Sequence, residues 1–118
     1  MISAFQRDAA GWWVYADPSS DLDYGIALKD WLQAGEVVSA AAWTVPAGVL
    51  KHDEAINAAP ITDKTGVVHP IGTVASVWLK PDIGAVVGTG YTVTCRLTTS
   101  SLPPRIDERS FRLVITER

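Results

Sequence analysis

"GYTVTCRLTT" (residues 90–99) and "RSFRLVITER" (residues 109–118) are the clearest indication of the fold, because apolar and polar side chains alternate along both stretches. A period of two is the mark of a β-strand with one buried face. The side chains expected to point inward are Tyr91, Val93, Cys95, Leu97, Phe111, Leu113 and Ile115. The sequence therefore predicts an antiparallel hairpin of residues 90–99 with 109–116. The loop between them, "SSLPPRIDE" (100–108), is long and contains Pro103 and Pro104.

Outward from this hairpin, other short apolar stretches are bounded by Gly, Pro and Asp, as strands usually are. The predicted strands are 22–28, 36–45, 48–52, 66–69 and 73–81. Between the first two, "KDWLQAG" (29–35) is predicted to form one helical turn that ends at Gly35 in a left-handed conformation. Many short strands without a long helix predict an all-β, immunoglobulin-like antiparallel β-sandwich over residues 17–118, preceded by an N-terminal arm, residues 1–16.

Five tryptophans stand against two phenylalanines, so a few large side chains carry much of the apolar surface. Three of them, Trp31, Trp43 and Trp78, lie at inward or strand-end positions and are predicted to pack in the core. The other two lie in the arm.

The arm contains the apolar stretch "GWWVYA" (11–16), which the turn-like "DPSSD" separates from the domain. Three interpretations are open for Trp12 and Trp13: they pack on their own chain, they contact another chain, or they stack on a ligand. We take Trp12, Trp13 and Tyr15 as candidate protein-interface residues, which would dock the arm on a neighbouring subunit.

A second candidate interface lies in "DERSF" (107–111), where the long loop returns to a strand. Asp107, Glu108 and Arg109 form a rim of mixed charge, and such a rim can set the register of a protein contact. The alternative is a solvated loop.

The sequence predicts no catalytic residue, no bound cofactor and no metal site. Asp17, Asp21 and Asp23 lack the central glycine and the final glutamate of a calcium loop. His52 and His69 lack a third ligand at zinc spacing and are read as exposed loop histidines. Cys95 is the single cysteine, and its place in the alternation predicts a buried, unreactive thiol.

Glycine-rich "GAVVGTGY" (84–91) precedes a strand, whereas a phosphate-binding loop precedes a helix, so it is read as a turn. The net charge of −3 and the scattered basic residues argue against nucleic acid as a partner. Membrane insertion is not expected, since no stretch reaches about 20 apolar residues. The N-terminus lacks the pattern of an export signal, and 118 residues are the size of one domain.

Several blocks in order, "LDY" (22–24), "DWL" (30–32), "WTVPAG" (43–48) and "DERSF" (107–111), give the chain a resemblance to a known family. It resembles small tailed-bacteriophage virion proteins known as fibre-tail adaptor or minor structural proteins, from about Asp17 to the C-terminus. Three segments depart from the family pattern: residues 1–15 look like an addition, 51–73 is longer than usual, and "SSLPPRI" (100–106) replaces the tight glycine-containing turn expected before "DERS".

The resemblance implies a non-enzymatic virion component that assembles with other virion proteins, in multiple copies, in the tail or tail-fibre region. Its expected location is the virion, after synthesis in the cytoplasm of the host bacterium. The alternatives are a capsid decoration protein and a carbohydrate-binding β-sandwich that contacts the host surface.

Overall fold

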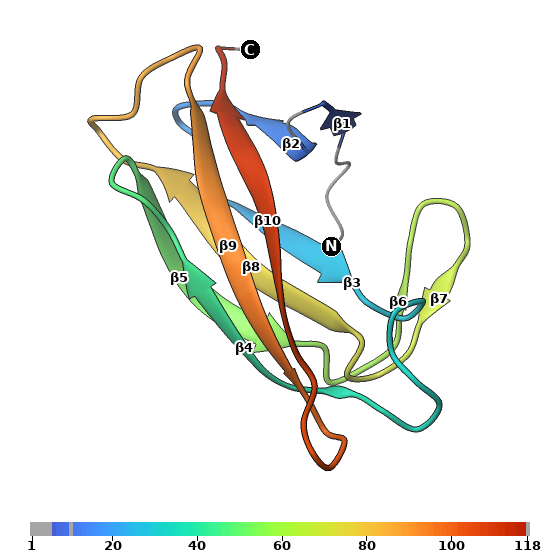
Figure 1. Cartoon of the computed structure of the whole chain (residues 1–118). Helices are drawn as coiled ribbons and strands as arrows, with labels where there is room; N and C mark the ends of the chain where they lie inside the picture. Colours follow the sequence, from blue (N-terminus) through green and yellow to red (C-terminus); the bar gives the residue numbers. More distant parts are fainter. Residues whose placement is uncertain (1–5, 10, 118) are drawn as a thin grey trace.

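The computed structural model of the chain describes residues 6–9 and 11–117, and this part is built from strands without a helix (Figure 1). The strands are β1 (Gln6–Asp8), β2 (Gly11–Ala16), β3 (Leu22–Ala27), β4 (Val38–Thr44), β5 (Val49–Ile56), β6 (Ile61–Thr62), β7 (Val68–His69), β8 (Val74–Pro81), β9 (Gly90–Thr99) and β10 (Ile106–Ile115). The predicted all-β class is confirmed.

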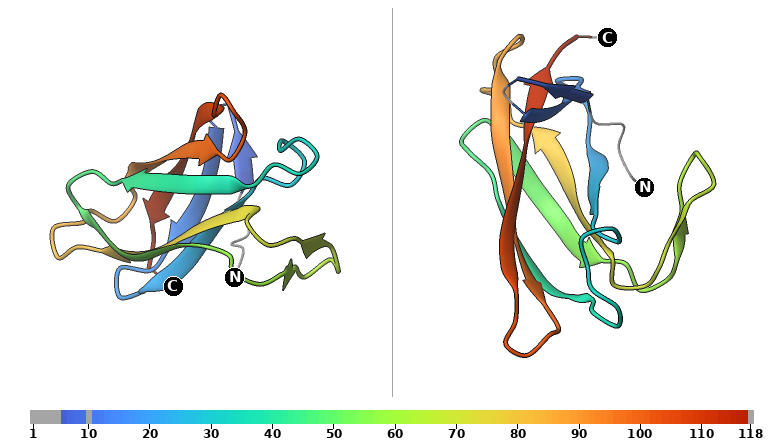
Figure 2. Two further views of the ribbon diagram at one scale, coloured as in Figure 1. Left: turned by 90° about the horizontal axis from the view of Figure 1, so that it is seen from below. Right: turned by 45° about the vertical axis from the view of Figure 1, so that its right-hand side comes forward.

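Two sheets face each other across the core. The five-stranded sheet has the order β1-β2-β10-β9-β4 and the three-stranded sheet the order β3-β8-β5. A separate two-stranded hairpin, β6-β7, projects to one side (Figure 2). The predicted hairpin is confirmed as β9 and β10, which pair antiparallel, with Phe111 opposite Val93 and Leu113 opposite Tyr91.

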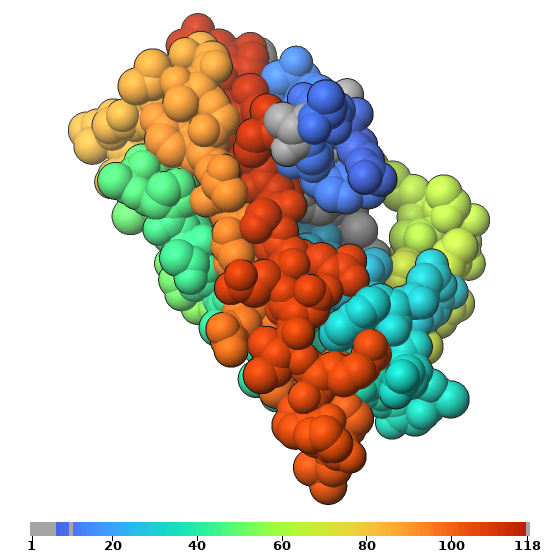
Figure 3. All heavy atoms as spheres, viewed as in Figure 1, coloured from blue at the N-terminus to red at the C-terminus, as the bar shows by residue number. Residues whose placement is uncertain are grey.

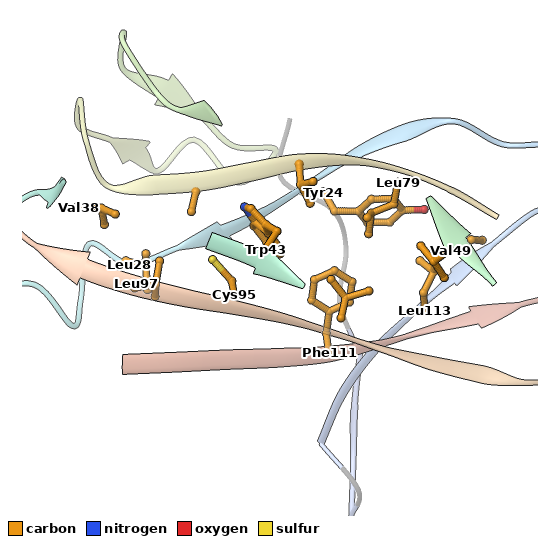
Figure 4. Close-up of a cluster of buried hydrophobic side chains, with 14 of the residues drawn as sticks. Tyr24, Leu28, Val38, Trp43, Val49, Leu79, Cys95, Leu97, Phe111 and Leu113 are labelled. Carbon is orange, nitrogen blue, oxygen red and sulfur yellow. The ribbon is translucent and has the colours of Figure 1, made fainter. Parts of the chain in front are cut away.

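The core lies between the two sheets and takes side chains from both of them (Figure 4). Trp43 on β4 is buried, as predicted, and its ring meets Phe111 edge-on at 6.3 Å. Phe111 in turn stacks with Tyr24 of the opposite sheet at 6.1 Å. These three rings therefore link the sheets, and their removal from water stabilises the sandwich.

Trp78 corrects the prediction that this ring lies in the core. It is 38% exposed on the outer face of the three-stranded sheet, opposite His52 on β5. Strand β8 instead turns Val77 and Leu79 inward, and both are fully buried. Both faces of this strand carry apolar residues, so the alternation alone did not show which face is buried.

Three other local expectations change. Residues 29–35 form successive turns and no helix, although Gly35 does adopt the predicted left-handed conformation, with φ of 76°. His69 corrects the expectation of an exposed loop histidine: it lies in β7, is 7% exposed, and its Nε2 lies 3.0 Å from Oδ2 of Asp63. Asp107, Glu108 and Arg109 lie within β10, since this strand begins at Ile106 and the preceding loop is shorter than expected.

Residues 11–16 of the expected arm form β2, which pairs in parallel with β10 from Trp13 opposite Arg112 to Ala16 opposite Ile115. Ala16 is buried and Val14 packs against the core. Residues 1–5 and 10 of the arm lie outside the described residues. Strand β2 is thus an integral strand of the sheet that carries the central hairpin.

Candidate protein interface at the open edge of the sandwich

The aromatic residues of β2 divide between the two faces of the sheet. Because Val14 and Ala16 point to the core, Trp13 and Tyr15 point outward, and their rings meet edge-on at 4.7 Å. Trp12 shares the inward side with Val14 but lies beyond the core, where it is 48% exposed. The guanidinium carbon of Arg7, its neighbour on β1, lies 5.5 Å from the Trp12 ring.

Trp12 forms one wall of a pocket of about 270 Å³ at an edge of the sandwich. The residues around it are Trp12, Gly25, Ile26, Ala27, Arg109, Ser110 and Phe111. They come from β2, β3 and β10, so the pocket spans both sheets. The structure thereby brings together Trp12 and Arg109, which the sequence placed in two unrelated candidate interfaces.

The pocket exists because β2 accompanies only part of β10. Pairing between them begins at Arg112, whereas β10 begins at Ile106. Among the described strands, residues 106–110 pair only with β9. Across the gap, β3 is the edge strand of the other sheet. The two sheets therefore leave this side of the sandwich open, a place where another chain can add contacts.

The opposite edge, where β4 and β5 meet, is closed by a side chain. Oε1 of Glu54 accepts a hydrogen bond from the backbone amide of Trp43 at 3.2 Å, and Oε2 binds Nζ of Lys51 at 2.7 Å. A register irregularity in β5 lies here, with Asp53 at a φ of 50°. A charged side chain on an edge amide opposes pairing with a further strand.

Charged groups border the pocket on the side of the 29–35 turns. Nε of Arg109 donates to Oδ2 of Asp107 at 3.0 Å, and the Arg109 guanidinium lies 5.5 Å from the Trp31 ring. Arg105 lies over the same ring at 4.3 Å and forms an ion pair with Glu36. Trp31 is thus held beside two guanidinium groups, which fixes the turn against β10.

The six predicted interface residues consequently occupy two surfaces. Trp12, Asp107 and Arg109 lie at the open edge. Trp13, Tyr15 and Glu108 lie on the outer face of the five-stranded sheet, where Glu108 stands opposite the exposed Arg96 in the strand register.

The sequence missed Ile26 and Phe111 as pocket residues and Arg105 as the partner of Glu36, because these contacts join segments far apart in the chain. The sequence did contain a signal for the ion pair of Glu36 with Arg105, since Glu36 ends the block "DWLQAGE" and Arg105 lies just before the block "DERSF".

A second polar cluster lies on the outer face of the three-stranded sheet. Nε2 of His52 lies 2.8 Å from Oδ1 of Asp21, and Nδ1 lies 2.7 Å from Oδ2 of Asp53. The imidazole also stacks with Trp78 at 5.7 Å. The hydrogen bonds to Asp21 and then to Asp53 raise the pKa of His52. The cluster fastens the turn before β3 to β5.

Features that could support other chemistry are few in the described residues. Burial raises the pKa of the Cys95 thiol to about 12, so this buried cysteine stays protonated. No group of three or more His, Cys, Asp or Glu side chains within residues 6–9 and 11–117 is placed to hold a metal ion. The same residues contain no helix long and apolar enough to cross a membrane.

Comparison with known proteins agrees with the resemblance seen in the sequence blocks. The model of a family described as "Podophage GP4 fiber-tail adaptor protein gp77" matches residues 16–114, which includes β3 to β9 and almost all of β10. No curated protein matches the chain.

Proposed function

The chain belongs to the podophage GP4 fibre-tail adaptor family, and on this premise we propose that the open edge is where it holds a neighbouring virion protein. It is a structural adaptor of the tail and fibre region. An adaptor acts through its surfaces, so the question is which surface carries the contact. The pocket lined by Trp12, Ile26 and Phe111 supports the open edge, since it is apolar, concave and bordered by charge.

Three properties of the pocket favour a protein contact. Trp12 is a large aromatic side chain that keeps about half of its surface in water, and tryptophan is enriched among residues that dominate binding energy. The Asp107–Arg109 pair at the rim can select the orientation of a partner. At the opposite edge, Glu54 already binds the backbone amide of Trp43, which opposes the addition of a further strand there. The open edge has no such obstacle among the contacts described above.

The finer architecture belongs to the same proposal. We infer that the two sheets form an immunoglobulin-like sandwich and that the chain works without catalysis, in several copies within the virion. Residues 1–16 serve assembly: β1 and β2 lie along β10 and present Trp12 to the open edge. The chain is made in the cytoplasm of the host bacterium.

The proposal is tested by complementing a phage that lacks this gene with variants of the chain. Trp12→Ala is expected to give a folded protein that enters particles at least tenfold less than the unchanged chain. Ile83→Ala is the control, because Ile83 is fully exposed on a turn outside the pocket and its loss is expected to change nothing. Normal incorporation of Trp12→Ala, measured in purified particles by quantitative mass spectrometry, would refute the proposed interface.

A further inference from the structure

We propose that the β6-β7 hairpin of a second copy of this chain fills the open-edge pocket. The hairpin and its flanks, residues 58–71, are called the finger below. This inference rests on the proposed function, since it names the partner of the same pocket.

The finger exposes apolar side chains that a soluble protein would normally cover. Val67, Val68 and Ile71 are 40%, 51% and 55% exposed. Charge is confined to Asp63 and Lys64 at the turn and to His69. In the space-filling view the finger projects at the side of the molecule, with a gap between it and the strands β1 and β2 (Figure 3). Exposed apolar groups gathered on a projecting element mark a contact with another molecule.

The base of the finger is rigidly held by Asn57. Its Nδ2 donates to the carbonyls of Ala59 and Pro70 at 2.9 and 2.8 Å. Its Oδ1 accepts from the backbone amides of Thr73 and Val74 at 3.0 and 2.9 Å. One side chain therefore ties both ends of the finger to β8, and the finger projects in a fixed direction.

The turn of the finger is equally well defined. Oδ1 of Asp63 accepts from the backbone amides of Thr65 and Val67 at 2.9 and 3.0 Å, and Oδ2 lies 3.0 Å from Nε2 of His69. Because the finger is already ordered, little conformational entropy is lost when it docks, and this makes a small apolar contact effective.

The volume and the lining of the pocket suit apolar side chains. It is a concave space of about 270 Å³ whose walls include Trp12, Ile26 and Phe111, so it suits aliphatic side chains such as those of Val67 and Val68. Residues of β3 line the pocket, and the finger projects on the β3 side of the molecule (Figures 1 and 2). Two copies related by a two-fold axis can therefore exchange fingers, so that each finger enters the pocket of the other copy.

Disulfide trapping between two single-cysteine variants of the full chain tests this contact. Chains carrying Val68→Cys are mixed with chains carrying Ile26→Cys under mild oxidation. We expect a cross-linked dimer at a yield at least fivefold above that of either variant alone. The native Cys95 does not compete, because it is buried and its pKa is raised. A mixture of Val68→Cys with Ile83→Cys is the matched control, since Ile83 is exposed outside the pocket.

Absence of the dimer above control yield would overturn the inference. An internal disulfide in the double variant Ile26→Cys/Val68→Cys would also overturn the inference. The oxidised variant would then remain at monomer mass, which would show that the finger reaches the pocket of its own chain. These outcomes are separate from those of the complementation experiment. If Trp12→Ala is excluded from particles but no cross-link forms, the pocket is an interface for a different virion protein and the second-copy inference falls.

Discussion

Glu36 binds Arg105 through both carboxylate oxygens: Nε of Arg105 donates to Oε2 at 3.1 Å, and Nη2 of Arg105 donates to Oε1. Glu36 is 8% exposed, whereas the Arg105 side chain is 33% exposed, so the carboxylate is the shielded partner of this ion pair. It joins the turns before β4 to the loop before β10, and Trp31 lies against it. The geometry at the lower border of the open edge thus depends on one charged pair.

We expect this pair to make the protein sensitive to acid. Hydrogen bonds from Arg105 and then from the amide of Gln33 hold the pKa of Glu36 well below its usual value of 4.5. A lowered pKa in the folded state contributes stability above about pH 4.5, and this contribution is lost as the pH falls below that value. Glu36→Gln should therefore be less stable than the unchanged chain at pH 7, with a difference that narrows below pH 4.5.

Urea unfolding at a series of pH values measures this difference. Glu117→Gln is the control, because Glu117 is exposed near the C-terminus. A difference between Glu36→Gln and the unchanged chain that stays constant from pH 7 to pH 3 would show that the charge of Glu36 is unimportant.

The two tryptophans Trp43 and Trp78 should differ clearly when each is replaced by alanine. Trp43 is 4% exposed within the core, so Trp43→Ala is expected to reduce the free energy of unfolding by about 3–5 kcal/mol. Trp78 lies on the outer face and loses mainly its contact with His52, so Trp78→Ala should cost roughly 1 kcal/mol. Denaturant unfolding of both variants gives the comparison, and equal losses would contradict the burial described above.

These two residues also show what the sequence could predict. The hairpin of β9 and β10 follows directly from its alternation, and Trp43 was correctly placed because the strand ends just before Pro46. Trp78 was misplaced because β8 has apolar side chains on both faces, so local pattern does not identify the buried one. Long-range packing determines which face of β8 is buried, because the smaller side chains of Val77 and Leu79 fit between the sheets.

The candidate site was predictable only in fragments. The sequence singled out Trp12 and Arg109, but no local pattern indicates that β2 pairs in parallel with β10 or that this pairing begins only at Arg112. That non-local register creates the pocket.

The pKa of His52 should lie above the ordinary 6.5 of histidine. The neighbouring carboxylates of Asp21 and Asp53 raise its pKa from the ordinary 6.5. A raised pKa in the folded state gives stability that is fully present below about pH 6.5 and is lost as the pH rises through the folded pKa. Asp21→Asn is therefore expected to lower the pKa of His52, whereas Asp30→Asn, at an exposed carboxylate in the 29–35 turns, should leave it unchanged. Proton NMR of the imidazole follows both, and an unaltered pKa in Asp21→Asn would exclude the ion pair.

Two adjacent residues of β2 should lose different amounts of stability when each is replaced by aspartate. Val14 packs against the core, so Val14→Asp buries a carboxylate without a partner and is expected to destabilise the protein by about 3 kcal/mol or more. Tyr15 points outward and is 42% exposed, so Tyr15→Asp should cost about 1 kcal/mol or less. Thermal unfolding of the two variants measures the difference. If β2 instead leaves the sheet in solution, as a detached arm would, both variants should be equally stable, because neither side chain would then be buried.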